Sequence, residues 1–79
     1  MSDIDARLRP ALAEEFEIEA SAITADASIG GSLGIDSLDM VDLAVVVEQT
    51  LSVKLTREEL ATATTYGDLV RLIGERLNG

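Results

Sequence analysis

A serine between aspartates marks the part of the chain that is best suited to chemistry, residues 33–43, which read LGIDSLDMVDL. Ser37 follows a glycine-bearing loop and lies where an apolar, helix-like pattern begins. As a catalytic nucleophile, a serine needs an adjacent base. The chain has no histidine and one lysine, Lys54, which lies beyond the expected helix, and the sequence does not match the G-x-S-x-G elbow. Serine catalysis is therefore disfavoured.

The loop before this serine gives a partial match to a calcium-binding loop. Asp26, Ser28 and Gly31 fall at the first, third and sixth positions of the EF-hand pattern. The match then fails, because Gly30 stands where a ligand side chain is expected and Ser37 where the bidentate glutamate belongs. No Gly-Lys-Ser/Thr follows the glycines either, so we expect neither a metal site nor a P-loop.

The composition leaves the chain little chemistry of its own. Its 79 residues fit one small domain, residues 1–79, without cysteine or histidine, so a thiolate, a disulfide and the commonest general base are missing. We therefore expect a protein that is not an enzyme. Fifteen acidic and six basic residues give a net charge of -9, which disfavours nucleic acid and anionic membranes and favours partners with basic surfaces.

We expect no export or membrane segment. The first residues, MSDIDARLRP, carry acids where a signal peptide needs a basic and then an apolar stretch. The longest purely apolar run, Leu43 to Val47, is too short to span a bilayer. These features predict a cytoplasmic protein, which we also expect to be a monomer.

Helical periodicity predicts an all-α fold, a small four-helix bundle with three longer helices, one short helix and a long loop between helices 1 and 2. The first helix is expected over residues 3–16, with a bend at Pro10 or a start shortly before it. Its apolar face comprises Ile4, Leu8, Leu12 and Phe16. The loop over residues 17–35 is expected to be ordered, because Ile18, Ile23, Ile29 and Leu33 can anchor it on the bundle.

The second helix is predicted to start at Asp36 or Ser37 and to end near Leu51. Its inward face is expected to comprise Leu38, Val41, Val45 and Leu51. The β-branched run over residues 45–47 leaves a central strand as the alternative.

Capping patterns predict where the last two helices begin. Thr56 followed by Glu59 fits a capping box before a short helix over residues 57–61, and Thr65 followed by Asp68 fits a weaker one. The apolar face of the last helix is expected to comprise Tyr66, Leu69, Leu72, Ile73 and Leu77.

Taken alone, the residues around the serine have a purely structural explanation. Asp36 and Ser37 are suitable helix caps, and Asp39 and Asp42 fit a solvated acidic face near the positive end of the helix.

The wider context of the serine resembles the acyl carrier proteins, the phosphopantetheine-binding carriers of the stand-alone type. The resemblance lies in residues 33–38, LGIDSL, followed by Val41-Asp42-Leu43. An Ile-x-x-Asp-x-x-Ile loop over residues 23–29 and Thr-Tyr-Gly-Asp-Leu at residues 65–69 occur in the same order as in that family. Nearly the whole chain is covered.

This resemblance implies that Ser37 is esterified by a phosphopantetheinyl transferase, which moves 4′-phosphopantetheine from coenzyme A onto the hydroxyl. The cofactor would supply the thiol that the chain lacks, so that acyl groups can be held as thioesters. The attached phosphate is expected to lie near backbone donors at the helix start.

The resemblance also implies docking to acyl-transferring, ketosynthase or ligase-type enzymes that carry basic patches. The residues expected to contact them are Asp36, Leu38, Asp39, Met40, Asp42 and Glu48. For any one of the acids, maintaining solubility is the simpler alternative.

The chain departs from the carriers of fatty-acid synthesis in two places. Valines and Gln49 replace much of a glutamate run, and Ser32 stands where many relatives have an aspartate. These differences favour a dedicated pathway, such as polyketide synthesis or another specialised product. A peptidyl carrier is disfavoured, because Ile35 stands where a second glycine is usual. The other alternative is an acidic, carrier-like interaction module that is never modified.

Overall fold

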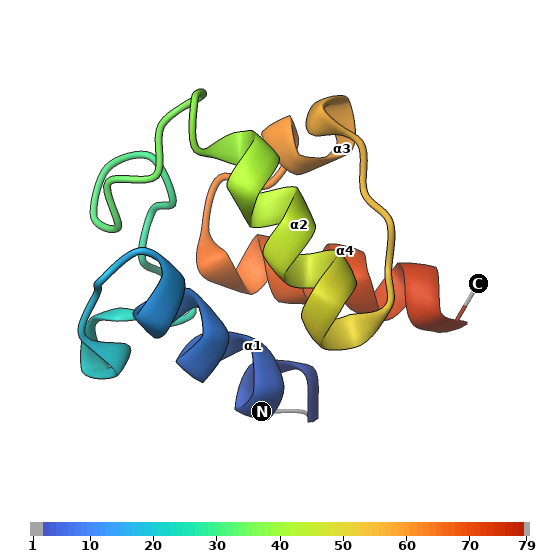
Figure 1. Cartoon of the computed structure of the whole chain (residues 1–79), viewed down its shortest axis with the longest axis horizontal. Coiled ribbons are helices and arrows are strands. Elements are labelled where there is room, and N and C mark those ends of the chain that lie inside the picture. Colours follow the sequence, from blue (N-terminus) through green and yellow to red (C-terminus); the bar gives the residue numbers. More distant parts are fainter. Residues whose placement is uncertain (1–2, 79) are drawn as a thin grey trace.

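The computed structural model describes residues 3–78, and this part of the chain forms four α-helices and one short 3₁₀-helix (Figure 1). The elements are α1 (Asp3–Glu15), η1 (Ala20–Ala22), α2 (Met40–Leu51), α3 (Arg57–Ala61) and α4 (Tyr66–Asn78). The predicted all-α bundle with three longer helices and one short helix is confirmed. No helix in the described residues is long and apolar enough to cross a membrane.

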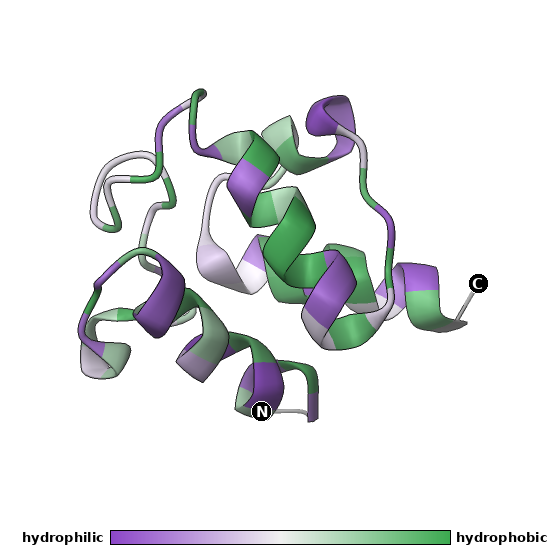
Figure 2. Cartoon of the chain, viewed as in Figure 1, coloured by the Kyte–Doolittle hydropathy of each residue, from purple (hydrophilic) through white to green (hydrophobic). Residues whose placement is uncertain are grey.

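The three longer helices share one apolar core, with α2 crossing in front of α4 in the view of Figure 1 and α3 lying beside α2. Figure 2 shows the α2 ribbon green over most of its length, which reflects its apolar sequence. The core residues are Leu8, Leu12, Ile23, Ala27, Ile29, Leu33, Ile35, Leu43, Val46, Val47, Val53, Leu55, Leu60, Ala63, Tyr66, Leu69, Val70 and Ile73.

Helix α1 runs through Pro10, so the expectation that the helix might begin only shortly before this residue is wrong. Leu8 and Leu12 are buried on either side of the proline, and burial of two leucines offsets the hydrogen bond that proline cannot donate. Ile4 and Phe16 are partly buried against the core, which confirms the expected apolar face.

The loop between α1 and α2 is packed onto the bundle, as predicted. Ile23, Ile29 and Leu33 are buried, while Ile18 is partly buried. Backbone hydrogen bonds also tie the loop to the chain around the start of α4: the Ile29 N–H donates to the Thr64 carbonyl at 2.9 Å, and the Tyr66 N–H donates to the Ala27 carbonyl at 3.0 Å. The loop is therefore a fixed part of the fold.

The inward face of α2 differs from the prediction. Leu43, Val46 and Val47 are buried, and Leu51 is partly buried. Leu38, Val41 and Val45 are instead 84%, 57% and 44% exposed. Apolar residues occur on both faces of this segment, so periodicity alone fits either orientation, and packing against the other helices selects the face of Leu43. The alternative of a central strand is wrong, because residues 45–47 are helical.

The starts of α3 and α4 confirm the predicted caps. The Thr56 hydroxyl accepts a hydrogen bond from the Glu59 N–H at 3.1 Å, and Glu59 Oε1 accepts one from the Thr56 N–H at 2.9 Å. Thr65 and Asp68 make the same reciprocal pair at 3.1 and 3.3 Å.

The apolar face of α4 is confirmed except at its end. Tyr66, Leu69 and Ile73 are buried and Leu72 is partly buried, but Leu77 is 52% exposed. Leu77 lies in the last turn of α4, close to where the helix ends, and it is absent from the core cluster.

A polar contact links the first and last helices across the core. The buried Tyr66 donates its hydroxyl hydrogen to Asp5 Oδ1 at 2.7 Å. Asp5 also accepts two hydrogen bonds from Arg9 Nη2, at 2.9 and 3.1 Å. Burial, reinforced by the neighbouring Asp5 carboxylate, raises the pKa of the Tyr66 phenol above its ordinary value.

We predict that Tyr66→Phe lowers the free energy of unfolding by about 1.5 kcal/mol, because Asp5 loses a hydrogen bond in a mostly buried position. Urea denaturation measures this change, and an unchanged midpoint would contradict it. In the native protein, protonated Tyr66 adds stability below about pH 10, the ordinary tyrosine pKa, and this stability is lost as the pH rises toward the higher folded pKa. Since Tyr66 is the one tyrosine, its phenolate absorbance should appear at higher pH in folded than in urea-unfolded protein.

Candidate functional site

The loop reaches the site through a sharp change of direction at Gly34. This glycine has φ 69°, a left-handed conformation that a side chain would strain. Ile35, which follows, is 1% exposed, and its N–H donates to the Ile29 carbonyl at 2.9 Å. The chain thus enters the core at Ile35 and leaves it again at Asp36, which is exposed.

Asp36 caps the turn that leads into α2. Its Oδ1 accepts hydrogen bonds from the Leu38 and Asp39 N–H groups at 3.0 and 3.1 Å, and Asp39 Oδ2 accepts one from the Asp36 N–H at 3.4 Å. The α-helix itself begins at Met40, after a turn over residues 37–39, so the predicted start at Asp36 or Ser37 is too early. Asp36 is a capping residue, as expected, but it caps this turn.

Ser37 is exposed on the turn, and its hydroxyl makes no hydrogen bond to any residue that the structure describes. The sequence predicted either Asp36 or Ser37 as a cap, and in the structure Asp36 performs this function. Because Ser37 does not act as a cap, its hydroxyl is open to a reaction partner.

A hollow of about 580 Å³ lies beside Ser37. It is lined by Gly30, Ile35, Asp36, Ser37, Met40, Arg57, Glu58 and Ala61. Three parts of the chain form its walls: the loop, the start of α2, and α3. Ile35, Met40 and Ala61 give it apolar surface, while Arg57 and Glu58 bring charges from α3.

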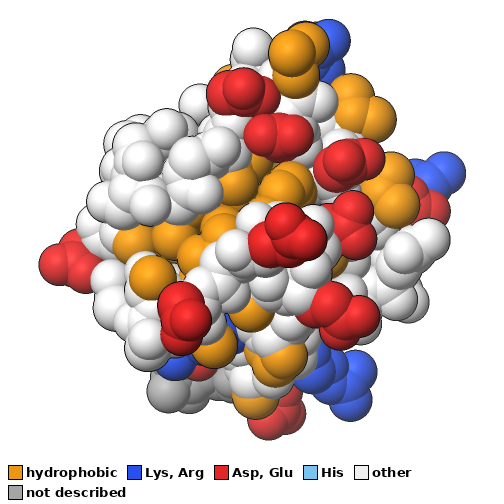
Figure 3. All heavy atoms as spheres, turned by 60° about the vertical axis from the view of Figure 1, so that its left-hand side comes forward, with side chains coloured by type: hydrophobic (Ala, Val, Ile, Leu, Met, Phe, Trp, Pro, Cys, Tyr) orange, Lys and Arg blue, Asp and Glu red, His pale blue; other side chains and the backbone are white. Residues whose placement is uncertain are grey.

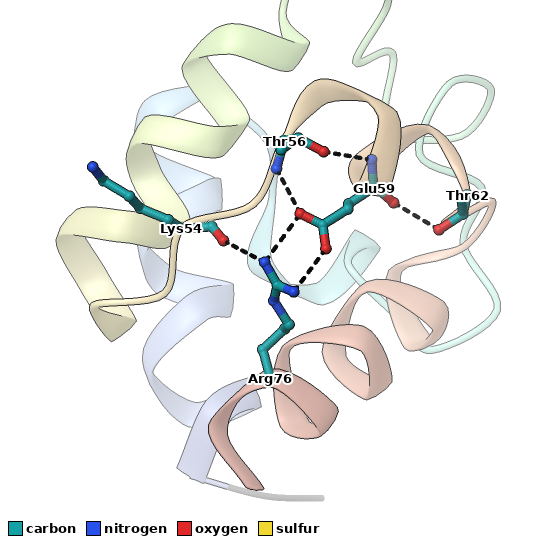
Figure 4. A network of polar contacts seen from close by, with 5 residues as sticks. All are labelled: Lys54, Thr56, Glu59, Thr62 and Arg76. Carbon is teal, nitrogen blue, oxygen red and sulfur yellow. Dashed lines mark hydrogen bonds and ion pairs between the residues drawn. The ribbon is translucent and has the colours of Figure 1, made fainter. Parts of the chain in front are cut away.

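A network of polar contacts holds α3 in position, and α3 forms one wall of the hollow (Figure 4). Arg76, near the end of α4, forms an ion pair with Glu59 at 3.0 Å and donates a hydrogen bond to the Lys54 carbonyl at 3.3 Å. The Thr56 backbone N–H, and to a smaller extent Arg76, hold the pKa of Glu59 below its ordinary value, against the opposing effect of desolvation. Leu60 of α3 is fully buried and anchors this helix in the core.

The surface around the site is acidic. Asp36, Asp42 and Glu48 are exposed, while Asp39 and Met40 are half-buried. Figure 3 shows acidic side chains around a central strip of apolar atoms, with basic side chains at the margins of this face. Of the residues expected to dock partners, Leu38 has the most exposed apolar side chain.

Sequence reasoning missed two groups of residues at this site. Val41 and Val45 were assigned to the core, but they are exposed on α2, and Leu38 is exposed on the turn before it. Arg57 and Glu58 were seen only as part of a short helix, yet they line the hollow next to Ser37. The capping box located α3 in the sequence, but it carries no information on which element α3 faces.

The surroundings of Ser37 suit a hydroxyl that accepts a chemical group from another molecule better than one that catalyses a reaction. An exposed hydroxyl stands beside a hollow with apolar walls, but the chain contributes no histidine or cysteine. In comparison with known protein families, the model described as "Phosphopantetheine attachment site" matches residues 6–73. The match extends from α1 into α4 and includes Ser37.

We predict that Asp36→Ala lowers the free energy of unfolding by about 1 kcal/mol, because two N–H groups before α2 lose their acceptor. Asp36→Asn, which keeps an acceptor oxygen, is the matched control and should lose much less. Urea denaturation of the two variants tests the cap. Equal stability of the alanine and asparagine variants would contradict it.

Proposed function

Because the chain belongs to the phosphopantetheine-attachment family, as a non-catalytic carrier of the acyl carrier protein type with a covalent 4′-phosphopantetheine group, we propose that Ser37 is the attachment residue. The observation that carries this proposal is the exposed, unpaired hydroxyl of Ser37 at the edge of the hollow. Ser37 also lies within the matched segment.

The residues around Ser37 fit a prosthetic arm. When bound, the group supplies a terminal thiol on which an acyl chain is held as a thioester, chemistry that a chain without cysteine cannot perform itself. Met40 and Ala61 offer apolar contacts beside the serine. The rigid loop and the capped turn keep the hydroxyl in one place while a modifying enzyme approaches.

In the proposed modification, the Ser37 oxygen forms a bond to phosphorus, and the adenosine bisphosphate half of coenzyme A leaves. A phosphopantetheinyl transferase binds coenzyme A and takes the serine proton. The role of the carrier is to present the hydroxyl.

We further propose that partner enzymes dock on the turn and on α2. The proposed contacts are Asp36, Leu38, Asp39, Met40, Asp42 and Glu48, and the exposed Val41 and Val45 extend their apolar part. Carboxylates steer basic partner surfaces toward this face, and the apolar side chains add short-range contact. The partners would be acyl-transferring, ketosynthase or ligase-type enzymes.

For the pathway, we propose a dedicated polyketide or other specialised route in preference to general fatty-acid synthesis. The support lies at the far end of α2, where Val45 is 44% exposed and Gln49 is uncharged and exposed. This end gives a basic partner few charges to contact. The burial of Ile35 counts against the alternative of a peptidyl carrier, for which a glycine is expected at this position.

We predict that incubation with coenzyme A and a broad-specificity phosphopantetheinyl transferase adds one phosphopantetheine to the wild-type chain and none to Ser37→Ala. Intact mass spectrometry reads the result. Ser32→Ala, which removes an exposed hydroxyl from the same loop, is the matched control and should load normally. Ser37→Ala should alter the free energy of unfolding by less than about 0.5 kcal/mol, because its hydroxyl has no partner. Loading of Ser37→Ala would move the attachment site elsewhere.

For the docking face, we predict that Asp42→Lys slows loading by the transferase or acyl transfer by a partner several-fold at low salt, because charge reversal weakens steering. The difference should shrink at high salt, where long-range attraction is already screened. Glu75→Lys, which makes the same change at an exposed site on α4, is the control. Equal rates for both variants would reduce the role of Asp42 to that of a solvated surface charge.

A further inference from the structure

A phosphodiester on Ser37 would bring a negative charge into acidic surroundings. Asp36 and Glu58 line the hollow next to the serine, and Asp39 lies on the same turn. Carboxylates at this range repel a phosphate, and the repulsion is stronger beside apolar walls than in open water. Some group of the protein must offset it if the arm is to rest against the hollow.

The two backbone N–H groups that directly follow Ser37 already have an acceptor. The N–H groups of Leu38 and Asp39, which directly follow Ser37, both donate to Asp36 Oδ1. A phosphate could use them only by displacing a carboxylate that already carries a full charge. The expectation that the phosphate lies near backbone donors at the helix start stays a prediction, but these two N–H groups are already occupied.

Arg57 is the one cationic residue among those that line the hollow. It is exposed and, among the residues that the structure describes, it forms no ion pair. Arg9, Arg71 and Arg76 differ in this respect, since each contacts a carboxylate within 3.0 Å. The guanidinium of Arg57 is thus available to a new anion.

The backbone of Arg57 is held in place even though its side chain is unpaired. It is the first residue of α3, directly after the Thr56 cap and in the same short helix as Glu59, which Arg76 holds. The chain therefore presents a positive charge from a fixed helix at the wall of the hollow that Ser37 also lines.

We propose that Arg57 binds the phosphodiester that joins the arm to Ser37, in the hollow between the loop and α3. The inference rests on the proposed attachment at Ser37. A guanidinium can donate two parallel hydrogen bonds to phosphate oxygens, which fixes orientation as well as charge. The contact holds the first part of the arm against α3 and beside Met40 and Ala61, while the thiol end stays free to reach partner enzymes.

The test uses NMR of the whole chain with ¹⁵N-labelled arginine, before and after enzymatic loading. The Nε–Hε signal of Arg57, assigned by its absence in Arg57→Gln, should move on loading by more than that of Arg7, a matched exposed arginine on α1 that is unpaired within the described chain. Once the signals are assigned, this comparison uses only the wild-type protein in its two forms.

The second measurement is the ³¹P signal of the loaded protein. Arg57→Gln should shift this signal, Arg57→Lys should shift it less because the charge is kept, and Arg7→Gln should leave it unchanged. In the wild type, high salt should move the ³¹P signal toward its position in Arg57→Gln, because ions screen the contact.

The outcomes separate this inference from the one on which it rests. If no arm attaches to Ser37, both fall. If the arm attaches but loading leaves the Arg57 signal unchanged, only the Arg57 contact is overturned. The same conclusion follows if the arm attaches but Arg57→Gln leaves the ³¹P signal unchanged. A shift in both signals, absent in the Arg7 control, supports the contact.

Discussion

Ile35 packs into the core with 1% of its surface exposed, so the residues that follow it must leave the core at one defined point. Gly34 supplies the left-handed turn that brings Ile35 inward, and Asp36 caps the turn that carries the chain out again. The hydroxyl of Ser37 is positioned by these two constraints. Neither depends on any chemistry of Ser37 itself, so the fold alone determines where this hydroxyl lies.

The hollow beside the serine depends on contacts that are distant in the sequence. Its α3 wall is held by Leu60 in the core and by the ion pair between Glu59 and Arg76. Its loop wall is held by backbone hydrogen bonds to the chain around the start of α4. Helix α4 therefore supports both walls, although the residues that line the hollow come from elsewhere.

The sequence predicted best what local interactions determine. The caps of α3 and α4 were predicted correctly because each consists of two residues three positions apart. Ser37 could be proposed as the attachment residue because its motif is contiguous, and that assignment stays a prediction. The inward face of α2 was misassigned, since Leu38, Val41 and Val45 have the same period as residues that pack inward. Arg57 was missed as a site residue because its proximity to Ser37 arises only when α3 folds against the loop.

The exposure of Leu38, Val41 and Val45 has a consequence for encounters between copies of this chain. Exposed apolar side chains favour contacts between molecules, including two identical ones. Here Asp42 and Glu48 are exposed on the same helix, so two copies that meet at this face bring like charges together. The resulting repulsion opposes self-association, and a basic surface meets no such barrier. If partners dock on this face as proposed, the same carboxylates would discriminate between a second copy and a basic partner before any apolar contact forms.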